Sequence, residues 1–148
     1  MRFIIQRVSH ASVEVEKKCI GKIEQGFLVF IGIKEGDTKE VADRLIKKLV
    51  HMRIFSDEND KINLSLSDVN GSLLLVSQFT LYANCKKGNR PSFTQAAPPK
   101  EAEQLYEYIV SSCKTQIENV QTGQFGADMK IDLRNEGPFT ILLDSEEL

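Results

Sequence analysis

The spacing of apolar residues constrains the fold most, because it changes from strand-like to helix-like and back along the chain. Apolar and polar residues alternate over residues 3–8 and again around Val13 and Val15, and residues 27–33 form a short apolar run. Alternation predicts half-buried strands, and a short apolar run predicts a buried one. Three strands are therefore predicted in the first third of the chain.

Two segments instead repeat their apolar residues every three or four positions, as amphipathic helices do. The first begins at Asp37, a favourable N-cap with Glu40 three residues later, and continues to Val50. The second has the prolines at 98–99 in its first turn and continues to Ile117. These segments are predicted to form the two main helices.

Four more segments have strand-like patterns: residues 53–55, 72–81, 129–133 and 139–143. The second of them follows the turn signal Asn70-Gly71 and contains a continuous apolar run, so it is predicted to be a central strand. The order of elements predicts an α+β fold, with two helices packed on a mostly antiparallel or mixed sheet. A length of 148 residues predicts a single domain over residues 1–148.

The charge balance limits how this chain can contact nucleic acid. Nineteen basic residues against 21 acidic ones give a net charge of −2, so no broad positive surface is expected. The densest basic segment contains Lys86, Lys87 and Arg90, within a predicted loop over residues 83–98. Loops of this length are usually functional or disordered. The basic segment is either a solvated loop or a phosphate contact. Any contact with nucleic acid is therefore predicted to be local, and no DNA partner is expected.

Several other classes of protein are excluded by what the sequence lacks. No apolar stretch approaches the roughly 20 residues that span a bilayer, and the first eight residues do not resemble a secretory signal, so a cytoplasmic protein is expected. Cys19, Cys85 and Cys113 are too widely spaced for a disulfide framework or a zinc site. No P-loop, G-x-G-x-x-G or H-E-x-x-H motif is present, so no metal and no cofactor is expected.

Polar residues follow the apolar run of the predicted central strand. Ser77, Gln78 and Thr80 lie where backbone N–H groups are released from the strand ladder and can point at a ligand. The alternative is purely structural, since Thr80 and Phe79 are residue types that favour strands. The sequence places neither histidine beside Thr80, so a conventional catalytic triad is not predicted.

Two glycine-containing segments near the C-terminus are further candidates. Gly137-Pro138 is either an ordinary turn or a place where bare main-chain carbonyls bind an amino group. Gly123 and Gly126 bracket Phe125, an aromatic residue that stacks on a base or else packs in the core.

Five short segments, spread over nearly the whole chain, are more specific together than any one of them alone. They are Ile5-Gln6-Arg7-Val8, Ser77-Gln78-Phe79-Thr80-Leu81, Lys87-Gly88-Asn89-Arg90-Pro91-Ser92-Phe93, Thr122-Gly123 with Phe125-Gly126-Ala127, and Asn135-Glu136-Gly137-Pro138-Phe139-Thr140. In this order they resemble the D-aminoacyl-tRNA deacylase family, also called the D-tyrosyl-tRNA deacylase family. Glu136 and Phe139 depart from the commonest family pattern, which has Asp and Val there, and Phe139 leaves the packing of the turn open.

The resemblance implies a barrel-like fold and an enzyme that hydrolyses the carboxylic ester between a D-amino acid and the terminal ribose of tRNA. It also implies hydrolysis of mischarged glycyl-tRNA, and a symmetric homodimer. In the family the Gly-Pro motif, here Gly137 and Pro138, is cis and enters the partner subunit's pocket. Its carbonyls hold the α-amino group of the substrate, and the pocket wall excludes an L side chain.

The resemblance further implies roles for individual residues. The catalytic group is Ser77, Gln78, Phe79 and Thr80, Arg7 braces the Gly-Pro motif, and Phe125 and Met129 hold the terminal adenosine. Backbone N–H groups near Phe79 and Thr80 are expected to stabilise the oxyanion while water attacks, with Thr80 and the ribose 2′-hydroxyl assisting. Two other readings stay open: a non-catalytic nucleic-acid or nucleotide-binding module, and a general Ser or Thr esterase.

Overall fold

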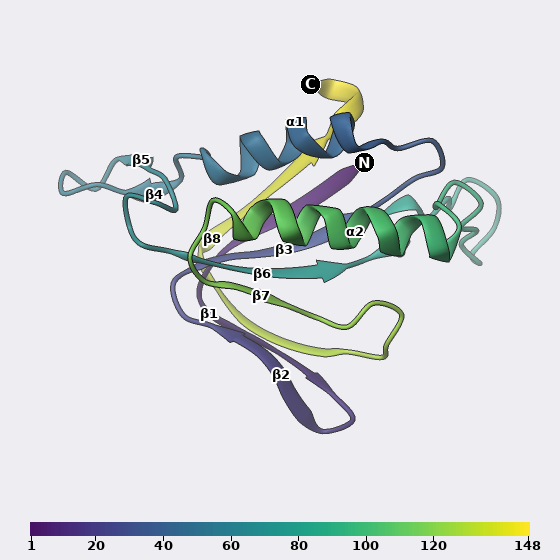
Figure 1. The fold of residues 1–148 in the computed structure, drawn as a ribbon, viewed down its shortest axis with the longest axis horizontal. Helices are drawn as coiled ribbons and strands as arrows, with labels where there is room; N and C mark the ends of the chain where they lie inside the picture. Colours follow the sequence, from purple (N-terminus) through teal and green to yellow (C-terminus); the bar gives the residue numbers. More distant parts are fainter.

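In the computed structural model, which describes residues 1–148, strand β1 (Arg2–Val15) pairs with three other strands (Figure 1). Its first half is antiparallel to β3 (Gly26–Gly32), and its second half is antiparallel to β2 (Lys18–Ile23). Along its other edge it is antiparallel to β8 (Lys130–Asp144) over nearly its whole length. The long strand β1 therefore joins the N-terminal strands β2 and β3 to the C-terminal strand β8.

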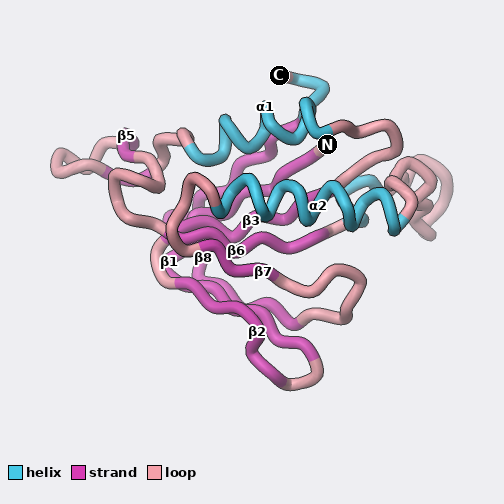
Figure 2. Tube along the Cα trace, viewed as in Figure 1, coloured by secondary structure: helices cyan, strands magenta, loops and turns pink.

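The rest of the main sheet is parallel. Strand β6 (Ser72–Ser77) lies between β3 and the short strand β7 (Val120–Thr122), parallel to both. The sheet curls until β2 contacts β6 and β7, which makes it nearly barrel-shaped (Figures 1 and 2). A separate small hairpin consists of β4 (Phe55–Ser56) and β5 (Ile62–Leu64). The predicted α+β fold with a mixed sheet is thus confirmed.

Helices α1 (Lys39–Val50) and α2 (Pro99–Lys114) cover the same face of the sheet (Figure 2). Their apolar faces pack on β1, β3 and β6 to form the larger core. Cys113 of α2 is fully buried in this core, as its position on the apolar face predicts, and burial raises the pKa of its thiol to about 12. Neither helix is long and apolar enough to cross a lipid bilayer.

A second, smaller core fills the inside of the curled sheet. Its buried members are Val8, Ala11, Val13, Ile23, Leu28, Leu74 and Val76. The central strand β6 contributes residues to both cores, and the segment 73–76 is buried on both faces. This burial explains why the central strand is a continuous apolar run rather than an alternating one.

The boundaries of several strands differ from the sequence prediction. Residues 3–8 and 13–15 belong to one strand, β1, and the two segments predicted over 129–133 and 139–143 belong to one strand, β8. Gly137-Pro138 lies inside β8 at a shift of register, and β8 is an edge strand, where the missing N–H of a proline breaks no ladder bond. Strands β2, β5 and β7 are short and rich in polar residues, so their patterns did not predict them.

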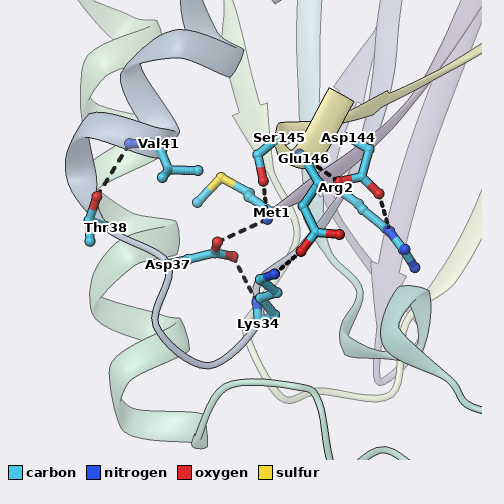
Figure 3. A network of polar contacts seen from close by, with 9 residues as sticks. All are labelled: Met1, Arg2, Lys34, Asp37, Thr38, Val41, Asp144, Ser145 and Glu146. Atoms are coloured by element: carbon cyan, nitrogen blue, oxygen red, sulfur yellow. Dashed lines mark hydrogen bonds and ion pairs between the residues drawn. The ribbon is translucent and has the colours of Figure 1, made fainter. Parts of the chain in front are cut away.

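Two element ends also differ. The predicted strand over 72–81 stops at Ser77, and the chain then forms the 3₁₀ helix η1 (Phe79–Tyr82). The N-cap of α1 is Thr38, whose hydroxyl accepts a hydrogen bond from the Val41 N–H (Figure 3). Asp37 does not cap the helix, because its carboxylate instead binds the amino group of Met1 and the Lys34 N–H.

A network of polar contacts connects the two ends of the chain (Figure 3). The buried amino group of Met1 lies 2.9 Å from an Asp37 carboxylate oxygen and 2.7 Å from Ser145 Oγ. Arg2 Nε lies 2.7 Å from Asp144 Oδ2, and Asp144 caps the C-terminal 3₁₀ helix η2 (Ser145–Glu147). Burial opposes ionisation of Asp144, but the Glu146 N–H and the Arg2 guanidinium outweigh it and lower the pKa of this carboxyl.

We expect Asp144→Asn to reduce the free energy of unfolding at pH 7 by about 1–3 kcal/mol, because the hydrogen bond from Arg2 loses its charged acceptor. A lowered pKa in the folded state contributes stability above the ordinary value of about 4, and this contribution is lost as the pH falls through the folded pKa. The difference between wild type and variant should therefore shrink below about pH 4. Urea unfolding at pH 7, 4 and 3 measures it.

The matched control is Asp132→Asn, which changes an exposed carboxylate on the same strand. A pH-independent loss of stability in Asp144→Asn, or an equal loss in the control, would contradict the assignment.

Candidate functional site

The candidate site begins where the central strand β6 ends. The Gln78 N–H donates to the Ile31 carbonyl of β3 at 2.8 Å, and the chain then turns into η1. Phe79 and Thr80 are the first two residues of η1, where a backbone N–H has no partner carbonyl within its own helix. The end of the strand therefore presents two N–H donors in sequence.

A cavity of about 740 Å³ lies beside this turn and has the size of a small-molecule site. Its wall is mostly apolar and includes Ser77, Gln78 and Phe79 from the strand end, with Phe125 and Met129 from the segment between β7 and β8. The structure thus brings together five of the predicted site residues, from two segments about 50 residues apart in sequence.

Phe79 forms one side of the cavity with an unusually exposed ring. Its side chain is 58% exposed, and it packs edge-to-face on Phe93 with the ring centroids 5.1 Å apart. An exposed aromatic pair at the mouth of an apolar cavity indicates a ligand-contact surface rather than core packing. Phe93 was not assigned a role from the sequence, although it ends one of the five segments that carry the family resemblance and lies in the long 83–98 loop.

The part of the cavity wall that Phe125 and Met129 form is supported by Tyr106 of α2 and by Gly123, which follows β7. The hydroxyl of Tyr106 donates to the Leu75 carbonyl at 2.9 Å, and its ring lies 6.0 Å from that of Phe125. Gly123 makes room for Met129, because a Cβ at position 123 would lie 2.6 Å from the Met129 sulfur. Contact with Tyr106 thus positions Phe125, and the absence of a side chain at Gly123 leaves space for Met129.

Thr80 lies next to the cavity rather than in its wall. Its exposed hydroxyl accepts a hydrogen bond from the side-chain amide of Gln78. His10 and His51 both lie outside the cavity lining, and the His51 ring is bound to the Lys47 carbonyl at the end of α1. Thr80 thus has a hydrogen-bonding partner but no histidine base within the cavity.

The Gly137-Pro138 segment forms a second group of predicted residues. The peptide bond between them is cis, as the family resemblance implies. Arg7 Nε donates to the Glu136 carbonyl at 3.0 Å, Arg7 Nη1 donates to the Ile54 carbonyl at 2.6 Å, and the guanidinium lies 4.7 Å from the Phe139 ring centroid. Arg7 therefore contacts both sides of the Gly-Pro motif.

These contacts also account for the two departures from the family pattern. Glu136 uses its main-chain carbonyl toward Arg7, so the longer side chain leaves this bond intact. Phe139 packs its ring under the guanidinium, and its N–H donates to Asn135 Oδ1 at 2.6 Å. The bulk of Phe139 is thus accommodated beside Arg7.

Within one chain the two groups of residues do not meet. Arg7 pairs with Phe27 near one end of β3, whereas Gln78 binds Ile31 near the other end. Gly137 and Pro138 are exposed and do not line the cavity.

The basic residues of the 83–98 loop lie outside the cavity wall. Lys86, Lys87 and Arg90 are exposed, while the base of their loop is closed by two backbone hydrogen bonds between Asn84 and Ser92, of 2.8 and 3.0 Å. The same loop carries Phe93, so positive charge is presented close in sequence to the aromatic edge of the cavity.

The fold and the site define an α+β protein with a nearly closed mixed sheet and an apolar cavity at the end of its central strand. A family model described as D-Tyr-tRNA(Tyr) deacylase matches residues 4–144. The chain belongs to this deacylase family.

Relatives and solved structures agree with this assignment. The chain is 54% identical over 148 residues to a D-aminoacyl-tRNA deacylase of Thermosipho africanus, covering 100% of this chain and 99% of the relative. It is 52% identical over 147 residues to one of Clostridium novyi, with 99% of both chains covered.

Two solved structures are similar over nearly the whole chain. One is described as c-Myc DNA Unwinding Element Binding Protein, with a TM-score of 0.92 and 36% identity over 97% of this chain and 98% of that one. The other is described as a probable eukaryotic D-amino acid tRNA deacylase, with a TM-score of 0.83 and 20% identity over 96% of this chain and 97% of that one, and it supports the fold alone.

Replacement of Arg7 by methionine should lower the free energy of unfolding by about 1–3 kcal/mol, because the carbonyls of Glu136 and Ile54 lose their donor. Arg134→Met is the matched control, since Arg134 is an exposed residue of β8, and it should change stability by less than about 0.5 kcal/mol. Urea unfolding of both variants distinguishes them. Equal stability of the two would mean that Arg7 does not brace the segment.

Proposed function

We propose that this chain, with residues 1–148 acting as one deacylase domain, hydrolyses the ester bond of D-aminoacyl-tRNA and of mischarged glycyl-tRNA. Membership of the deacylase family supports this proposal. The observation that carries it is the cavity at the end of β6, whose lining combines Phe79, the first residue of η1, with the apolar side chains of Phe125 and Met129. The products are the free D-amino acid and tRNA.

The chemistry follows from the donors at the strand end. Attack of water on the ester carbonyl creates an oxyanion, which the N–H groups of Phe79 and Thr80 stabilise. Each such donor contributes about 2.7–4 kcal/mol, so two provide on the order of 5–8 kcal/mol if their effects add. Thr80 positions the substrate, held by Gln78, and the vicinal ribose 2′-hydroxyl assists the attack.

Ser77 and Gln78 contribute to the same wall. The terminal adenosine of tRNA lies against Phe125 and Met129, where stacking on an aromatic ring contributes about 1–3 kcal/mol per base. Lys86, Lys87 and Arg90 contact the nearby phosphates. These few contacts suit a protein of net charge −2 that acts in the cytoplasm on the tRNA end alone.

Chiral selection requires a second copy of the chain. The cis Gly137-Pro138 motif is exposed and lies outside the cavity of its own chain, which supports its insertion into the cavity of a partner. In a symmetric homodimer each subunit then receives one motif from the other. The main-chain carbonyls hold the α-amino group, and the wall leaves no room for an L side chain.

The proposal is tested with matched D- and L-aminoacyl-tRNA, glycyl-tRNA and a small activated ester. We expect release of the D-amino acid and of glycine, and no release from the L-substrate or the small ester, because the site depends on the tRNA end and on the bare carbonyls. Scintillation counting of released amino acid measures this. Equal hydrolysis of both enantiomers by a monomer would refute the proposal.

Thr80→Ala should retain measurable turnover, with kcat reduced less than about tenfold, because the backbone N–H at position 80 is unchanged. Single-turnover deacylation and intact-protein mass spectrometry check this. Loss of turnover by three decades or more with an intact fold, or an aminoacyl adduct on Thr80, would assign it as the nucleophile.

Gly123→Ala should raise KM roughly threefold to tenfold, about 0.7–1.4 kcal/mol, with little change in kcat. The added methyl group meets the Met129 sulfur and moves it into the cavity. Combining Gly123→Ala with Met129→Ala removes the clash, so the double variant should have the KM of Met129→Ala alone. Additive increases in KM would show that the two positions are not coupled.

The second candidate function is a non-catalytic nucleic-acid-binding module. It is favoured by the similarity to a solved structure that is described as a DNA unwinding element binding protein. Such a module would bind tRNA or DNA without releasing any amino acid. The exposed basic loop fits either function, so the release assay decides between them.

A further inference from the structure

The Arg2 side chain of β1 contacts η1, the short helix that carries the proposed oxyanion donors. Arg2 Nη1 donates to the Leu81 carbonyl at 3.0 Å, and the Arg2 guanidinium lies 4.7 Å from the ring centroid of Tyr82. Both contacts fall on η1, directly after Thr80. The guanidinium is itself fixed by Asp144, whose oxygen lies 2.7 Å from Nε.

The helix η1 depends on such contacts because it is very short. It has four residues, and hydrogen bonds from Leu81 to Gln78 at 3.3 Å and from Ala83 to Thr80 at 3.0 Å stabilise it. A single 3₁₀ turn does not hold its geometry without tertiary packing. On one side Leu81 packs so closely on β3 that a Cβ at Gly32 would lie 2.8 Å from the Leu81 Cβ.

Tyr82 anchors the end of this turn in the interior. Its side chain is buried, and its hydroxyl has no hydrogen-bonding partner. Packing and the guanidinium above its ring therefore hold the residue, rather than a hydrogen bond of its own.

We infer that Arg2 is a positioning residue for deacylation: its ion pair with Asp144 fixes the guanidinium, which holds the Leu81 carbonyl and the Tyr82 ring and so orients the N–H groups of Phe79 and Thr80 toward the cavity. This inference rests on the proposed function of those two N–H groups. Preorganised donors stabilise an oxyanion only while they stay aimed at it, and a displacement of about 1 Å costs on the order of a hundredfold in rate.

The geometry requires arginine rather than a positive charge alone. Nε and Nη1 of one planar group donate in two directions, to Asp144 on one side and to Leu81 on the other. A lysine reaches the carboxylate but does not reproduce this fork. Arg2→Lys therefore separates the stability of the ion pair from the orientation of η1.

The experiment compares Arg2→Met and Arg2→Lys with Glu146→Gln, a control that removes the neighbouring ion pair between Glu146 and Lys34, in which no residue of η1 takes part. We expect kcat to fall about tenfold to a hundredfold in Arg2→Met, with KM within about twofold of wild type. Arg2→Lys should recover most of the stability of wild type but little of the lost kcat. Glu146→Gln should keep wild-type kcat.

Amide hydrogen exchange provides a readout that needs no substrate. Exchange at the Leu81 and Ala83 amides, which donate to the Gln78 and Thr80 carbonyls, should be faster in Arg2→Met and in Arg2→Lys than in wild type and unchanged in Glu146→Gln. Unchanged exchange in both Arg2 variants, or recovery of kcat together with stability in Arg2→Lys, would overturn the inference. Absence of deacylation by the wild type would refute the proposed function, while the exchange rates would still decide whether Arg2 holds η1.

Discussion

The pairing of β1 with three strands is the constraint on which the rest of the structure depends. Because β3 and β2 share one edge of β1 and β8 occupies the other, the ends of the chain are held in the same sheet. Pairing with β3 places β6 at the centre, and the end of β6 determines where the chain turns into η1. The pairing of β1 with β3, which begins at Arg2, thus determines where the candidate site lies.

The cavity is assembled from segments with different sources of rigidity. The strand end is fixed by the sheet and by the Gln78 hydrogen bond to β3. The wall of Phe125 and Met129 lies on a loop, and it is supported by Tyr106 of α2 and by the missing side chain at Gly123. Loops carried on a rigid scaffold are the usual place for binding residues. Here the loop of Phe125 and Met129 and the 83–98 loop, through Phe93, both line the cavity at the end of β6.

The sequence predicted the fold class and the central strand because buried positions are occupied by apolar residues, and their spacing can be read directly. The run over 73–76 is apolar since both of its faces are covered. The two helices were equally clear, although Asp37 was wrong as the N-cap, because its carboxylate binds the Met1 amino group, a partner 36 positions away that local patterns do not reveal. Strands β2, β5 and β7 were missed for a similar reason: their pairing partners, not their own composition, define them.

For the site, the motifs identified the residues that line the cavity but not how they meet. Ser77, Phe79, Phe125 and Met129 line one cavity, whereas the packing of Phe93 on Phe79 and the contacts of Arg2 depend on tertiary structure that the motifs do not specify. The roles of Thr80 and of the Gly-Pro motif in catalysis and chiral selection came from the family resemblance and stay predictions.

The position of Pro138 has a consequence for how copies of this protein can associate. Strand β8 runs along an open edge of the main sheet, and such an edge is a template onto which further strands add without limit. Pro138 has no N–H to donate, and the register of β8 shifts around it, so the row of backbone donors along this edge is interrupted near its middle. Pro138 thereby makes this edge a poorer template for the addition of a further strand.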